Sequence, residues 1–162
     1  MRRTPVVLAA LALSLLSARC WDDVTGLSGP DFPESTLQGS AKSYTYCAFD
    51  TFGTALVRGV MFLAIDDSDR VTGLWDLRRI GTGPTMIGPQ VGTGRLEGFR
   101  EGATIWMNLN PQYADNNVML FGTIRGSGIY GTWEYIGFPG VLSRGRFRAL
   151  RLSERPEPPS ER

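Results

Sequence analysis

The chain has 162 residues, enough for one domain with a single modest core. Its 17 basic and 16 acidic side chains give a formal net charge of +1, so no strong field exists to recruit nucleic acid. It contains no histidine, which removes the commonest general base, Ser–His and Cys–His pairs, and imidazole metal ligands. These features favour a non-enzymatic protein without a metal or other cofactor.

The first nineteen residues have the features of an export signal. Arg2 and Arg3 form a charged start, and the apolar stretch 6–16 that follows is short for a bilayer span. We therefore expect residues 1–19 to be removed from an exported protein. Their removal would leave 14 basic and 16 acidic groups, a net charge of about −2.

Cys20 leaves two outcomes open. Residues 15–20 resemble the lipobox of bacterial lipoproteins, although Arg19 stands where Gly, Ala or Ser is usual. This resemblance implies a lipid on Cys20 and anchorage to a membrane of the cell envelope, facing the periplasm or the cell exterior. Cleavage after Ala18 would instead leave Cys20 able to form a disulfide with Cys47 in an oxidising compartment, in a secreted or periplasmic protein.

Two segments lack any sustained hydrophobic period. Residues 20–42 are rich in Asp, Gly, Ser and Pro, and we expect a flexible tether. Residues 153–162 are rich in Pro, Glu and Ser, and we expect a disordered tail. The folded domain is therefore expected at residues 43–152.

Within that domain, apolar and polar residues alternate in short segments separated by turn-forming residues. No segment after residue 20 has helical spacing with proper caps. Consecutive strands with short links predict an all-β, eight-stranded antiparallel up-and-down barrel, because closure removes exposed sheet edges. The expected strands are 43–51, 55–66, 70–79, 90–99, 102–110, 117–125, 128–137 and 143–152.

The alternation also predicts which side chains face inward. The expected interior positions are Val57, Gly59, Met61, Leu63, Ile65, Val71, Gly73, Trp75, Leu77, Ile105, Met107, Leu109, Ile129, Gly131, Trp133 and Tyr135. The opposite face carries Arg58, Asp76, Arg78, Asn108, Glu134, Arg146 and Arg148, together with Trp106 and Tyr130.

A Gly-x-Trp pattern occurs twice, at residues 73–75 and 131–133. With eight consecutive strands it resembles the calycin group of lipocalins and avidin-like proteins. In that group the pattern lies in the first strand, whereas here it lies in the third and seventh. Barrels of that group hold a small apolar ligand or serve as folding scaffolds. The resemblance therefore implies a barrel that could enclose a cavity, and no ligand-binding residue can be transferred from it.

The candidate ligand-binding residues are large side chains expected inside the barrel: Met61, Trp75, Trp133, Tyr135 and Phe147. An eight-stranded barrel can hold one small ligand, so these side chains could line a pocket. Equally, they could simply fill the core. In the first case the protein would bind a small apolar molecule or an envelope component; in the second it would be a structural or protein-interaction module.

Two charged clusters have weaker claims to function. Asp66, Asp67 and Asp69 lie at a predicted hairpin tip, where aspartate favours turns; calcium binding is the alternative, but the spacing lacks the Gly and Glu of an EF-hand. Arg144, with Arg146 and Arg148, could meet anionic lipid, although a solvated strand face explains the row more simply. This row and the absence of an aromatic C-terminus disfavour a membrane-spanning barrel.

Overall fold

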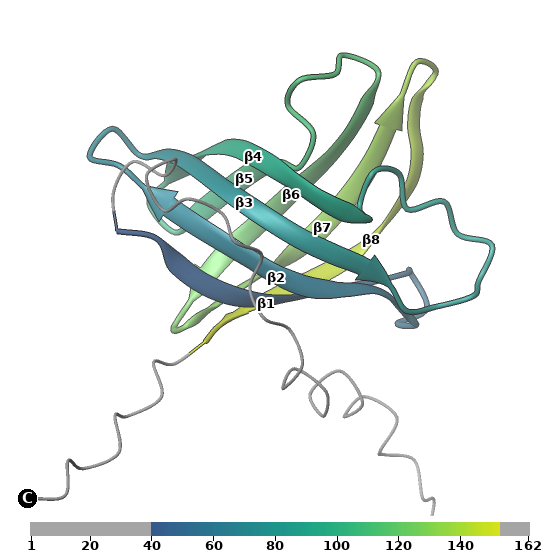
Figure 1. Cartoon of the computed structure of the whole chain (residues 1–162), viewed down its shortest axis with the longest axis horizontal. Helices are drawn as coiled ribbons and strands as arrows, with labels where there is room; N and C mark the ends of the chain where they lie inside the picture. The colour runs from purple at the N-terminus through teal and green to yellow at the C-terminus, as the bar shows by residue number, and fades with distance from the viewer. Residues whose placement is uncertain (1–39, 153–162) are drawn as a thin grey trace, which may run out of the picture.

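The computed structural model describes residues 40–152, which form a closed antiparallel β-barrel (Figure 1). Each strand pairs with the next along the chain, and β1 pairs with β8 to close the sheet. The predicted fold class is therefore confirmed. The strands are β1 (Lys42–Phe49), β2 (Ala55–Ile65), β3 (Arg70–Arg79), β4 (Gly92–Glu101), β5 (Thr104–Asn108), β6 (Asn116–Arg125), β7 (Gly128–Gly137) and β8 (Gly140–Arg151).

Several sequence-based expectations concern residues outside this range. The export signal, Cys20 with its lipid or disulfide, most of the tether and the C-terminal tail lie outside the described residues. Within residues 40–152, no helix has the length and apolarity that crossing a membrane requires.

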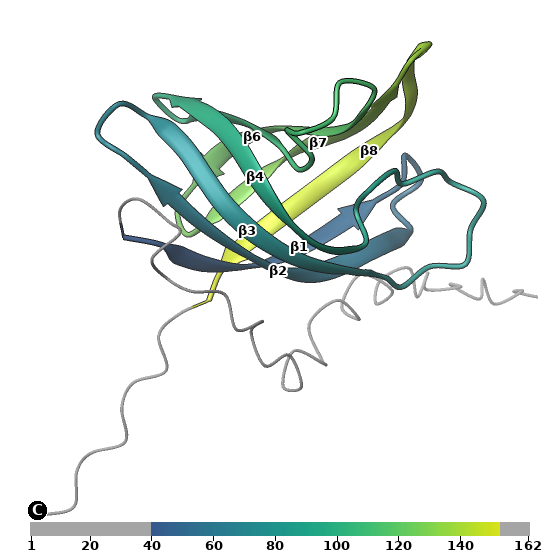
Figure 2. The same cartoon turned by 45° about the horizontal axis from the view of Figure 1, so that its top comes forward.

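Several observed strand boundaries differ from the expected ones, and two of these differences affect the ends of the barrel. β8 begins at Gly140 rather than at residue 143, because Gly140 has a positive φ of 108° and pairs with Gly137 across a tight turn. β4 begins at Gly92 rather than at residue 90, so Gln90 belongs to the long β3–β4 connection. Figure 2 shows this connection extending beyond one end of the barrel.

The inward faces of the strands form one continuous hydrophobic core. Of the expected interior residues, all the apolar ones are buried in it or packed against its edge. Trp106 and Tyr130 lie on the exposed outer surface, as their places in the alternation predict. Each fully buried large side chain contributes about 1.5–3 kcal/mol of hydrophobic stabilisation, so this alternation is what makes the barrel stable.

The two Gly-x-Trp segments bring neighbouring strands unusually close. A Cβ added to Gly73 would lie 2.4 Å from the carbonyl oxygen of Phe62, and one added to Gly131 would lie 1.9 Å from that of Phe121. Real side chains do not tolerate such contacts with backbone atoms. Glycine is therefore required at both positions by the approach of the adjacent strand.

The tryptophans of these segments connect distant parts of the barrel. The Trp75 Nε1–H group donates to the Leu109 carbonyl at 2.9 Å, and the Trp133 Nε1–H group donates to the Phe49 carbonyl at 2.8 Å. Because β8 separates β7 from β1, the second bond spans β8, where the Trp133 indole lies over Gly145. Each indole thus satisfies its polar group while filling the core.

We predict that Gly131→Ala destabilises the protein by about 3 kcal/mol, because the new methyl group collides with the β6 backbone. Urea denaturation of the purified protein, fitted with a common slope, measures the effect. The control is Gly83→Ala, where nothing lies within 4 Å of the added atom and the change should stay within about 0.5 kcal/mol. Equal effects of the two changes would contradict a close strand contact.

Candidate functional site

The two ends of the barrel are built differently. At one end the β3–β4 connection folds over the opening and buries Ile87 and Gln90. The Tyr46 hydroxyl donates to Gln90 Oε1 at 2.9 Å, and Gln90 Nε2 donates to the Ile87 carbonyl at 2.8 Å. The Ser143 hydroxyl also donates to the Met86 carbonyl. We call this the closed end.

Burial keeps the Tyr46 phenol at the closed end protonated. Loss of solvation raises the pKa of Tyr46 well above the ordinary tyrosine value of 10.0. The phenol therefore remains protonated and serves as the donor to Gln90. Sequence reasoning missed this pair, because a polar residue between Pro89 and Val91 has no hydrophobic period that would indicate burial.

The candidate ligand-binding residues lie together in the hydrophobic core. The core cluster contains Met61, Trp75, Trp133 and Phe147, with Tyr135 packed against it. The Phe147 ring stacks on Tyr46 with centroids 5.9 Å apart. Their role in binding a ligand stays a prediction.

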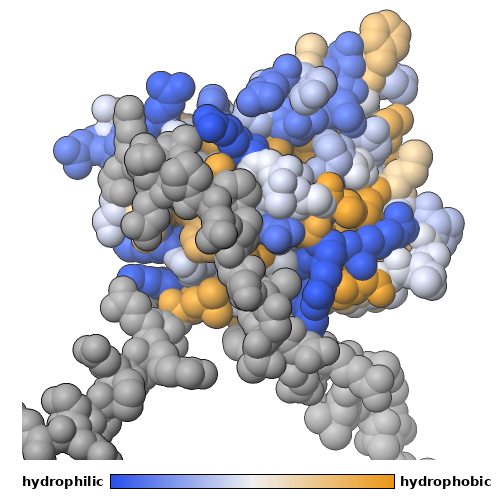
Figure 3. All heavy atoms as spheres, viewed as in Figure 1, coloured by the Kyte–Doolittle hydropathy of each residue, from blue (hydrophilic) through white to orange (hydrophobic). Residues whose placement is uncertain are grey.

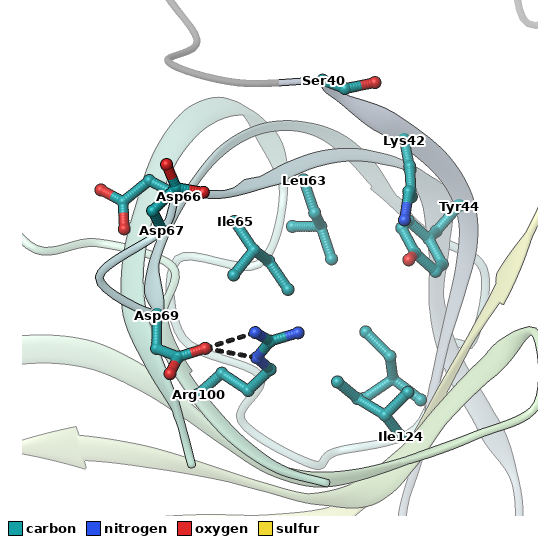
Figure 4. A pocket seen from close by; sticks show the side chains of 11 residues that line it. Ser40, Lys42, Tyr44, Leu63, Ile65, Asp66, Asp67, Asp69, Arg100 and Ile124 are labelled. Atoms are coloured by element: carbon teal, nitrogen blue, oxygen red, sulfur yellow. Dashed lines mark hydrogen bonds and ion pairs between the residues drawn. The ribbon is translucent and has the colours of Figure 1, made fainter. Parts of the chain in front are cut away.

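The opposite end of the barrel contains a pocket of about 430 Å³, which we call the open-end pocket (Figure 4). Its volume falls within the range of about 300–1,000 Å³ for small-molecule sites. None of the five core candidates lines it. The lining residues are Ser40, Lys42, Tyr44, Leu63, Ile65, Asp66, Asp67, Asp69, Arg100, Ile124 and Ile129.

The floor of the open-end pocket is apolar, because inward-facing positions of several strands reach their ends here. Leu63 and Ile65 come from β2, Ile124 from β6 and Ile129 from β7. Three of these four were expected in the interior from their alternation. The pocket itself was not predicted, since it arises where strand ends meet, and these are far apart in the chain.

The rim is polar and partly fixed by turn geometry. Asp66 Oδ1 accepts the backbone N–H groups of Ser68 at 2.8 Å and Arg70 at 3.0 Å, so the expected turn role is observed for this residue. The Arg100 Nε–H group donates to Asp69 Oδ1 at 2.7 Å, and the two side chains form an ion pair. Across residues 40–152, no cluster of three or more acidic, cysteine or histidine side chains is arranged to hold a metal ion.

Tyr44 and Lys42 form the wall on the β1 side. Figure 4 shows both side chains beside the space that the Arg100 guanidinium enters from the other side. Partial burial raises the pKa of Tyr44, and the positive charge of Arg151 opposes this shift. The phenol is therefore neutral at physiological pH and can donate or accept a hydrogen bond.

The arginine row on β8 lies on the outer surface. Arg144 and Arg146 are exposed and border a shallow pocket of about 240 Å³. The Arg148 guanidinium lies over the Phe49 ring, 5.3 Å from its centroid. The row is thus separate from the open-end pocket.

No family model matches the chain, and no curated protein matches its sequence. Among solved structures, the chain is similar to rhizavidin in complex with biotin, with 15% identity over 70% of this chain and 100% of that chain and a TM-score of 0.46. It is also similar to intact afifavidin in its apo form, with 19% identity over 75% of this chain and 88% of that chain and a TM-score of 0.44. Both are avidin-family structures.

We predict that Tyr46→Phe lowers the free energy of unfolding at pH 7 by about 1–3 kcal/mol, because it leaves the buried Gln90 Oε1 without its donor. Urea denaturation measures the loss. Tyr130→Phe is the matched control, since that residue is exposed, and it should have little effect. A loss no greater than that of the control would show that the closed end does not depend on this bond.

The raised pKa of Tyr46 also predicts the response to alkaline pH. Above about pH 10 the unfolded chain loses the phenolic proton while the folded protein keeps it, so the free energy of unfolding falls as pH rises. The Tyr46 contribution to this slope is at most about 1.4 kcal/mol per pH unit. Denaturation curves between pH 9 and about 11 should therefore decline less steeply for Tyr46→Phe than for the wild type; parallel declines would contradict the assignment.

Proposed function

We propose that this protein is a non-enzymatic binding protein that holds a small amphipathic molecule in the open-end pocket. The observation that carries this proposal is the pocket of about 430 Å³ at one barrel end, with an apolar floor under a charged rim. The interior beyond the floor is occupied by large buried side chains such as Met61 and Trp133. A ligand would therefore enter from the open end and stop at the core.

The lining indicates which part of a ligand would lie where. Ile65, Ile124 and Ile129 provide surface for a hydrocarbon chain or ring. Lys42 and Arg100 lie at the rim, where a polar head group would remain close to water. This arrangement favours an amphipathic molecule with its apolar part inserted first.

The chemistry of the rim supports binding rather than conversion of the ligand. Asp66 accepts backbone N–H groups of its own turn, and Asp69 is engaged by Arg100. General acid–base catalysis needs a titratable group with its pKa matched to its task, placed against the reacting atom. Holding and releasing a molecule requires only the pocket surface.

Export is part of the proposal and is supported by the sequence of residues 1–19. A lipid on Cys20 would hold the barrel at a membrane of the cell envelope. A disulfide between Cys20 and Cys47 would leave it secreted or periplasmic. The two outcomes exclude each other, since each uses the Cys20 sulfur.

A second candidate function is supported by the outer surface. Phe99, Trp106 and Phe121 are direct cross-strand neighbours on β4, β5 and β6, and each is 40–45% exposed. Exposed aromatic rows are typical of protein-interaction surfaces. In this alternative the barrel is a scaffold, and the aromatic row binds another protein of the envelope.

We predict that native mass spectrometry of protein purified from its source detects a bound small molecule. Ile65→Trp should abolish this adduct, because the larger ring occupies the pocket. Ile80→Trp is the control, since this exposed residue does not line the pocket, and it should retain the adduct. With the identified molecule, titration should show at least about a tenfold weaker affinity for Ile65→Trp only.

The two functions give different outcomes in the same preparation. An adduct that persists in folded Ile65→Trp would place the ligand elsewhere and contradict the open-end pocket. Absence of any adduct, combined with a protein complex that Trp106→Thr dissociates, would favour the scaffold. Circular dichroism of each variant establishes that the barrel is intact.

A further inference from the structure

One part of the outer barrel surface is buried although it points away from the core. Cys47, Val60, Ala64 and Leu74 alternate with inward-facing residues of β1, β2 and β3 and are only 4%, 6%, 0% and 5% exposed. We call these four residues the covered face. On β4–β7, by contrast, no outward-facing side chain is buried. Figure 3 shows the mixed polar and apolar character of the outer surface in this view.

The strands themselves do not cover this face. Among the described residues, the strands that pack together extensively are neighbours in the sheet, so no strand lies across the outside of β1–β3. The β3–β4 connection packs at the closed end, where Ile87 and Gln90 are buried. An apolar surface in the middle of these strands therefore needs a cover from outside residues 40–152.

Cys47 indicates what this cover is. Its sulfur is disulfide-bonded, and residues 40–152 contain no free cysteine. The whole chain has two cysteines, and the other one is Cys20. We propose that Cys20 and Cys47 form a disulfide, and that this bond holds the segment 20–39 against the covered face.

The charges around Cys47 fit the residues that follow Cys20. Cys47 lies opposite Arg148 of β8 and Arg58 of β2, and Arg58 lies opposite Arg78 of β3, so a row of three arginines crosses this surface. The sequence after Cys20 is Trp21-Asp22-Asp23. Two carboxylates beside three guanidinium groups, with an indole over apolar residues, make a complementary contact.

The segment 20–39 is long enough to reach the covered face if Cys20 is bonded to Cys47. Cys47 lies five residues into β1 from Lys42, a rise of roughly 17 Å along the strand. The 19 residues between Cys20 and Ser40 can span about 60 Å when extended. The segment can therefore reach back along β1 and still cross β2 and β3.

Formation of the bond requires the export that forms part of the proposed function. The two thiols lose two protons and two electrons to a disulfide oxidant, which is reduced to a dithiol as the Sγ–Sγ bond forms. The Cys20 sulfur is then unable to carry a lipid. The proposal thus selects the disulfide over the lipid anchor.

The first test is a non-reducing peptide map of the full chain, expressed in a bacterial host and purified from the exported fraction. We expect one linked pair of peptides, containing Cys20 and Cys47, and a mass two hydrogen atoms below that of the reduced protein. Acylated Cys20, two free thiols in the exported protein, or a Cys47–Cys47 link between copies would each overturn the proposal. An unprocessed, reduced chain would show that the proposed export is wrong. The purified protein would then be oxidised with glutathione disulfide, and failure to form the Cys20–Cys47 disulfide would overturn the present proposal as well.

The second test concerns the cover itself. Hydroxyl-radical labelling of Val60 and Leu74 should increase several-fold in Cys20→Ser relative to the oxidised wild type, while labelling of exposed Phe121 stays the same. Unchanged labelling of Leu74 in a folded Cys20→Ser protein would overturn the assignment of residues 20–39 as the cover. Cys47→Ser should reproduce the result of Cys20→Ser.

Discussion

Pairing of β1 with β8 is the constraint on which the rest of the structure depends. Six residues of β1 pair with β8, from Tyr44 opposite Arg151 to Phe49 opposite Arg146, and this ladder joins the two ends of the sheet. Without it, alternating residues of every strand would still have two faces, but neither face would enclose a core. Closure makes one face an interior and removes both edges that could pair with other chains.

Because the barrel is closed and its interior is filled, an interior pocket can form only at one of its two ends. The interior of an eight-stranded barrel is about as wide as its own side chains, and here it contains Trp75, Trp133 and Phe147. At the closed end, the β3–β4 connection adds Ile87 and the Tyr46–Gln90 pair. At the open end the connections are tight turns that cannot fold inward, so a hollow remains above the isoleucine floor.

The sequence predicts the barrel well because its period-two alternation is a local property of each strand. Ile105, Met107 and Leu109 could be assigned to the interior without knowing which strands are neighbours. Gln90 could not be found in this way, since its burial depends on a hydroxyl that is 44 residues away in sequence. The open-end pocket was missed for the same reason: the positions of Ile65 and Ile129 on their strands were predictable, but their meeting at one barrel end follows from closure.

The outer surface shows that position on a strand does not determine exposure. Leu74 and Trp106 both point outward, yet the smaller side chain is buried and the larger one is 43% exposed. From the alternation of the strands alone, Leu74 and Trp106 would both be expected to face solvent. The difference lies in what packs on them, and the proposed Cys20–Cys47 disulfide would hold a segment against one face only. A disulfide on the outside of a barrel can therefore stabilise a surface that the sheet alone would leave exposed to water, while the open end remains accessible to a ligand.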